Sequence, residues 1–137
     1  MSRLLKKNDK FIVKVSPSYV AAQSDPENHK FTWSYEVTIT NHSSEIAQLL
    51  NRFWRIIDMS GKIEEVQGVG VVGLQPLIKP EKTFTYISYC QLTVPQGTME
   101  GYYEMQNLEE ERFIIEVPKF ILTAPSSITK AFRSRLH

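Results

Sequence analysis

The sequence contains a single cysteine, Cys90, and no long hydrophobic run. One cysteine excludes an internal disulfide framework and suits a reducing compartment, so we expect a cytoplasmic protein. No apolar stretch approaches the roughly 20 residues that span a bilayer, and the N-terminus lacks a signal-peptide core, which argues against membrane insertion. With 137 residues, 42% hydrophobic and 23% charged, the chain fits one ordinary globular domain.

The net charge of +1 conceals an uneven distribution along the chain. Residues 1–10 and 128–137 each carry a charge of +3, whereas residues 11–127 hold nine Lys and Arg against fourteen Asp and Glu. Because nucleic-acid binding needs a clustered basic face, this acidic body argues against nucleic acid as the main partner. We divide the chain into a basic N-terminal arm (1–10), a central domain (11–127) and a basic C-terminal tail (128–137). We expect both ends to be flexible and solvated, although the tail could form a short helix.

Helical periodicity is almost absent from the central domain, whereas alternation of apolar and polar residues recurs throughout it. Residues 31–41 alternate most clearly, which predicts a strand with one face on a core and one in water. The run 48–59 is so apolar that it favours a strand covered on both faces, although a short helix is possible. Further strand-like runs lie at about 10–22, 62–67, 82–93, 98–106 and 112–117, between turn sequences. We expect Pro118 to interrupt the continuation of the last run to residue 123. About seven strands at regular spacing predict an all-β, antiparallel sandwich.

Three glycines follow the spacing Gly-x-Gly-x-x-Gly: Gly68, Gly70 and Gly73. In dinucleotide-binding folds this spacing joins a strand to a helix whose N-terminus holds the pyrophosphate. Here Pro76 and Pro80 would break such a helix within a turn or two, and residues 83–99 supply no Asp or Glu for a ribose. The pattern therefore favours a glycine-rich loop between strands. One alternative stays open, in which the loop amides form a nest for a small anion or a nucleotide phosphate.

Residue patterns typical of catalytic or metal-binding sites are missing. The three histidines lie in predicted turns or at the C-terminus, away from Cys90, so no zinc-type metal site is expected. Glu100 and Glu104 share a strand face that Glu116 could oppose, and paired carboxylates could do acid–base work, but an exposed sheet face is charged in any case. The run 109–111 is typical of a solvated acidic turn, and direct, weak binding of a divalent cation there is a further alternative. We expect no enzyme, no cofactor and no small-molecule substrate.

The best candidate for a binding surface is the run Arg52-Phe53-Trp54-Arg55. Arg and Trp are the residue types that contribute most at the centre of protein interfaces. We predict that Arg52, Trp54 and Arg55, together with Glu65, contact a protein partner. In the alternative interpretation, Trp54 is a core residue and both arginines pair with local carboxylates such as Glu64 or Glu65.

Several motifs, in this order and spacing, resemble the ApaG family. They are Phe53–Ile56, Glu65–Gly73, Pro76, Pro80-Glu81, Phe84-x-Tyr86-x-Ser88, Gly97–Gly101 with Tyr103 and Met105, and Pro118-x-Phe120. The resemblance spans roughly residues 11 to 128, with departures at Lys82 and Tyr89. It implies an immunoglobulin-like or fibronectin type III-like sandwich.

The same resemblance implies a bacterial cytoplasmic protein linked to cobalt resistance and magnesium efflux, by a mechanism that the family does not reveal. Related domains in eukaryotic F-box and polymerase-interacting proteins suggest a protein-binding module. We therefore expect a protein-interaction domain that supports Co²⁺ and Mg²⁺ homeostasis indirectly, through a protein partner.

Overall fold

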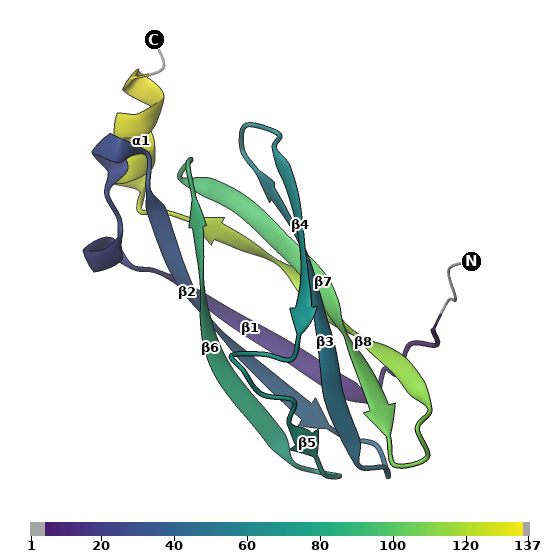
Figure 1. Ribbon diagram of the computed structural model, residues 1–137. Helices are drawn as coiled ribbons and strands as arrows, with labels where there is room; N and C mark the ends of the chain where they lie inside the picture. The colour runs from purple at the N-terminus through teal and green to yellow at the C-terminus, as the bar shows by residue number, and fades with distance from the viewer. Residues whose placement is uncertain (1–4, 136–137) are drawn as a thin grey trace.

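A computed structural model describes residues 5–135 of the chain. In this part of the chain, strands make up two sheets that pack face to face, and a helix lies at the C-terminal end (Figure 1). In chain order the strands are β1 (Phe11–Tyr19), β2 (Phe31–Asn41), β3 (Ala47–Asp58), β4 (Ile63–Val69), β5 (Leu77–Ile78), β6 (Thr83–Leu92), β7 (Gln96–Asn107) and β8 (Arg112–Thr123). Helix α1 (Ser126–Arg135) follows β8, and two single turns of 3-10 helix, Ala21–Gln23 and Pro26–Asn28, separate β1 from β2.

One sheet has the strand order β1-β2-β6, and the other has the order β4-β3-β7-β8, with the short β5 beside β3. Every pairing between these strands is antiparallel. The prediction of an all-β, immunoglobulin-like sandwich is therefore confirmed. All seven predicted strands are present, and β2 has the same residues as the predicted strand. The expected interruption at Pro118 is wrong, because β8 continues through it to Thr123, and β5, two residues long, was not expected.

The core lies between the sheets because every second side chain of a strand points to the same face. In β2 these side chains are Phe31, Trp33, Tyr35, Val37 and Ile39, and in β7 they include Met99, Tyr103 and Met105. The hydroxyl groups of Tyr86 in β6 and Tyr103 in β7 lie 2.5 Å apart, so a hydrogen bond connects the two sheets.

Strand β3 differs from the prediction, because only one of its faces lies in the core and Arg55 is exposed. Its pairing with β7 shifts by one residue between Leu49 and Asn51, which marks a β-bulge. Beyond the bulge, Arg52 and Trp54 turn toward the other sheet, whereas Phe53 and Arg55 face outward. Because side chains alternate between the two faces of a strand, the two predicted binding arginines, three residues apart, lie on opposite faces.

Both ends of the chain pack against the sandwich, so the expectation of flexible ends is wrong for the described residues. The amide of Ile114 donates to the carbonyl of Lys6, and the amide of Asn8 donates to the carbonyl of Ile114, both at 2.9 Å. Helix α1 confirms the possible helix in the tail, and Phe132 packs edge-on against Phe31 with ring centroids 5.7 Å apart. Residues 1–4 of the predicted arm and 136–137 of the predicted tail lie outside the described residues.

Candidate functional site

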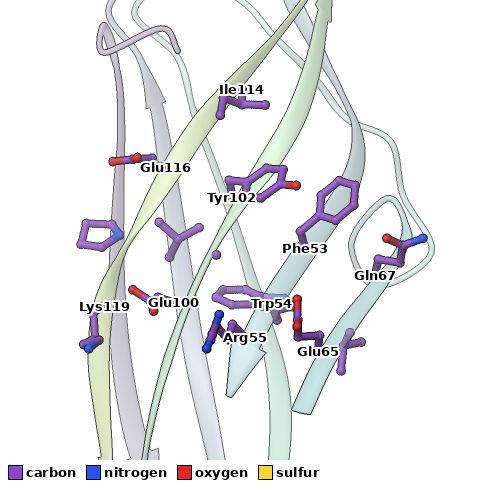
Figure 2. A pocket seen from close by; sticks show the side chains of 14 residues that line it. Phe53, Trp54, Arg55, Glu65, Gln67, Glu100, Tyr102, Ile114, Glu116 and Lys119 are labelled. Carbon is purple, nitrogen blue, oxygen red and sulfur yellow. The ribbon is translucent and has the colours of Figure 1, made fainter. Parts of the chain in front are cut away.

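A groove of about 630 Å³ lies on the outer face of the β4-β3-β7-β8 sheet (Figure 2). Four strands contribute to it because every second residue of each strand points to this face. The side chains that matter most are Glu65 from β4, Phe53 and Arg55 from β3, Glu100 and Tyr102 from β7, and Glu116 and Lys119 from β8.

Phe53 and Tyr102 form the apolar centre of this groove. The two residues are directly paired across β3 and β7, and their rings stack with centroids 4.5 Å apart and planes inclined by 17°. Tyr102 is 36% exposed, so its ring remains available to a second molecule. Gly101 lets β3 and β7 approach here, because a Cβ at this position would lie 2.0 Å from the carbonyl oxygen of Phe53.

Charged side chains surround the stacked rings. Arg55 is in register with Glu65 on one side and with Glu100 on the other, as Figure 2 shows. Among the residues that the structure describes, none of these three forms an ion pair within 4.0 Å. Glu116, by contrast, lies 2.6 Å from Lys7 of the N-terminal segment. The groove therefore offers an aromatic centre and a rim that carries both signs of charge.

The predicted partner-binding residues are only partly brought together. Trp54, Arg55 and Glu65 line the groove, but Arg52 lies on the inner face of β3. Trp54 is 5% exposed and its ring contacts Tyr35, so it is a core residue, as the alternative interpretation expected. The other part of that interpretation, pairing of both arginines with Glu64 or Glu65, is wrong for the described residues.

The sequence placed Phe53 in the candidate run 52–55, but it did not point to Tyr102 or Lys119 as residues of the same site. Their proximity depends on the β3–β7 and β7–β8 registers. The sequence feature that could have indicated this site is Tyr102, a large aromatic residue on the same strand face as Glu100 and Glu104. Glu104 itself is occupied by hydrogen bonds from Asn51 at 2.6 Å and Arg112 at 3.3 Å.

The predicted glycine-rich loop is confirmed. Gly68 belongs to β4, while Gly70 and Gly73 have φ values of +63° and +80°, and strand β5 rather than a helix follows. Nη1 of Arg52 donates to the carbonyls of Val69 at 3.1 Å and Gly70 at 2.9 Å.

The amides of Gly70 and Val71 donate to the carbonyls of Leu50 and Leu74. Two amides that an anion nest would need are therefore already engaged. A hollow of about 190 Å³ lies beside the loop, and the residues that line it include Arg52, Tyr35, Tyr86, Ser88 and Gly73.

The acidic run 109–111 and Cys90, also considered in the sequence analysis, have structural explanations. The side chain of Asn107 accepts hydrogen bonds at 3.0 Å from the amides of Glu109 and Glu111, which confirms a turn in this acidic run. Within residues 5–135 no three His, Cys, Asp or Glu side chains are grouped so as to hold a metal ion. Burial, with a smaller contribution from the charge of Glu64, raises the pKa of the Cys90 thiol to about 11.

No helix in the described part of the chain is long and apolar enough to cross a membrane.

These features define a fibronectin type III-like β-sandwich domain that presents an aromatic, charge-rimmed groove on one sheet. Residues 21–107 match the family model described as the ApaG domain. The chain is 44% identical over 115 residues to Protein ApaG of Mesorhizobium japonicum, which covers 84% of this chain and 88% of the relative. It is 45% identical over 113 residues to Protein ApaG of Brucella abortus, with 82% and 87% covered.

The crystal structure of a protein described as ApaA from Bordetella pertussis has the same fold, with a TM-score of 0.82 and 41% sequence identity. That similarity covers 89% of this chain and 98% of the Bordetella protein. The chain therefore belongs to the ApaG domain family.

Proposed function

We propose that this chain is a non-enzymatic protein-interaction domain that binds a partner protein through the groove on the outer face of the β4-β3-β7-β8 sheet. The observation that carries this proposal is the exposed Phe53–Tyr102 stack with charged side chains around it. Protein interfaces typically combine an aromatic centre, which supplies most of the binding energy, with a polar rim that fixes orientation.

We further propose that the domain acts in the cytoplasm and contributes to Co²⁺ and Mg²⁺ homeostasis through its partner. The resemblance to the ApaG family supplies this link. The composition of the groove supports an indirect route, because Arg55 and Lys119 lie among its acidic residues and Lys7 neutralises Glu116. A divalent cation in the groove would meet these positive charges.

Affinity capture from a cell lysate tests the proposal when it is repeated with paired variants. Arg55→Glu reverses a charge in the groove, and its control, Lys14→Glu, makes the same change on the exposed face of β1. Tyr102→Ala removes the stacked ring, and its control, Ile121→Ala, removes an exposed side chain from β8. We expect both groove variants to reduce recovery of the partner at least about tenfold, equivalent to ~1.4 kcal/mol, while both controls retain it. Recovery that is unchanged in both groove variants would refute the assignment.

A second candidate function is small-anion or nucleotide-phosphate binding in the hollow beside the glycine loop. The observation in its favour is the guanidinium of Arg52, which faces this hollow together with Tyr35 and Ser88. Since the amides of Gly70 and Val71 are engaged, Arg52 would supply the main attraction. Amide NMR during titration with pyrophosphate should show shifts at Gly73 that disappear in Arg52→Gln. Absence of shifts at millimolar ligand would exclude this function.

A further inference from the structure

Apart from the two-residue β5, the two sheets end in four edge strands, and three of these carry features that oppose pairing with another chain. Charged residues, prolines, bulges and covering segments are the usual means by which proteins block a sheet edge. The features here are Lys14 and Pro17 in β1, Glu64 and Glu65 in β4, and Pro118, Lys119 and the adjacent residues 6–8 at β8.

Strand β6 is the fourth edge, and its own sequence has none of these features, although the glycine loop lies near the inner face of Ser88. Its ten residues include no charged residue, no proline and no glycine. It pairs with β2 over ten consecutive residues without a register shift. Within the described residues, no backbone hydrogen bond reaches β6 from a segment other than β2. On its outer face Ile87 is 51% exposed and Tyr89 is 57% exposed, so this edge is an open template with apolar side chains beside it.

The sequence of β6 is also symmetrical in chemical character about Ser88. A two-fold axis at Ser88 would bring two copies of the strand together antiparallel, each residue facing its counterpart on the other side of the axis. The facing pairs would be Phe84 with Leu92, Thr85 with Gln91, Tyr86 with Cys90, and Ile87 with Tyr89. Apolar residues meet apolar residues at Phe84–Leu92 and Ile87–Tyr89, polar residues meet at Thr85–Gln91, and no charge meets its own copy.

We propose that this chain forms a two-fold dimer in which β6 pairs antiparallel with β6 of a second copy, about an axis at Ser88. Pairing joins two three-stranded sheets into one sheet of six strands and satisfies the backbone groups at both open edges. The groove lies on the other sheet of each copy, so the dimer presents two grooves. A partner with two binding sites would then be held with increased avidity. The dimer does not depend on the groove being a partner-binding site.

Disulfide trapping tests the register of this pairing. In a Cys90→Ser background, Ser88→Cys places the two new thiols directly opposite each other, within reach of a disulfide. Thr85→Cys is the matched control, because six residues of offset separate the two copies of residue 85 by about 20 Å. We expect mild oxidation to give a covalent dimer of Ser88→Cys and a monomer of Thr85→Cys. Equal cross-linking of both variants, or of neither, would overturn the proposal.

Sedimentation equilibrium over about a hundredfold range of concentration tests the same surface without cross-linking. The unmodified chain should associate to a dimer, and Ile87→Lys should be a monomer because it sets two new positive charges beside the axis. Ile121→Lys adds the same charge on the exposed face of β8 and should leave the dimer intact. Circular dichroism checks that both variants are folded. A chain that stays monomeric throughout, or a dimer that persists in Ile87→Lys, would refute the proposed interface.

Discussion

The hydrogen bond between the Tyr86 and Tyr103 hydroxyls is the contact whose removal gives the clearest energetic prediction. Tyr86 is 6% exposed and Tyr103 is fully buried, and among the described residues neither hydroxyl has another partner. Replacing either residue by Phe therefore leaves one buried hydroxyl without a hydrogen bond. Such a group costs about 1–3 kcal/mol, so Tyr86→Phe and Tyr103→Phe should each lower the free energy of unfolding by that amount.

The double variant, Tyr86→Phe with Tyr103→Phe, should cost less than the sum of the two single variants. Both hydroxyls are then absent, so no unsatisfied polar group remains in the core. Urea unfolding followed by the fluorescence of the buried tryptophans Trp33 and Trp54 measures all four proteins. Strict additivity of the two single variants would show that the hydroxyls do not interact, and would refute the reasoning.

The same tyrosines predict a pH dependence at high pH. Burial raises the pKa of both hydroxyls well above the ordinary value of about 10. Because each pKa is raised in the folded state, the stability that it contributes is complete below about pH 10 and is lost as the pH rises further. Each tyrosine that ionises only in the unfolded state should contribute a decline of about 1.4 kcal/mol per pH unit. The double variant should therefore show a shallower decline than the unmodified chain.

Three further predictions follow from single residues. Urea unfolding should show that Gly70→Ala destabilises the fold much more than Gly73→Ala. A left-handed backbone costs a residue other than glycine about 1–2 kcal/mol at both sites. Only at Gly70 would the added Cβ also meet a backbone oxygen, at 2.2 Å. Burial acts to raise the pKa of Asp58, yet hydrogen bonds from Ser60 and Lys62 outweigh it and lower the pKa. The stability that ionised Asp58 contributes is thus present above about pH 4 and is lost as the pH falls through the pKa of the folded state. Asp58→Asn should therefore have a lower free energy of unfolding at neutral pH, and the difference from the unmodified chain should shrink in acid. Phe132→Ala should undock α1, which hydrogen exchange would detect as lost protection in residues 126–135 without loss in the sheets.

The fold could be predicted from the sequence wherever the signal is local. The alternation in residues 31–41 defines β2, and the turn residues 58–61 define the β3–β4 hairpin, where the amide of Gly61 donates to the carbonyl of Asp58 at 3.0 Å. The two prolines after Gly73 correctly exclude a helix there. Each of these features depends on neighbours within about one strand or turn.

The candidate site could be predicted only in part, because its geometry depends on pairing between distant strands. Strand alternation alone would have placed Arg52 and Arg55, three residues apart in the sequence, on opposite faces of β3. The stack of Phe53 on Tyr102 requires the β3–β7 register, which no local pattern in either strand specifies. The contact of residues 6–8 with β8 is likewise long-range, and so the basic composition of the arm wrongly suggested a flexible end.

Site-specific photo-cross-linking in living cells is the most direct test that a partner protein occupies the groove. A photoreactive phenylalanine analogue in place of Tyr102 should capture one discrete protein, and adding Arg55→Glu should abolish that product. The same analogue in place of Ile121, on the same sheet but outside the groove, should capture none. No product from position 102, or the same products from both positions, would contradict the proposed role of the groove.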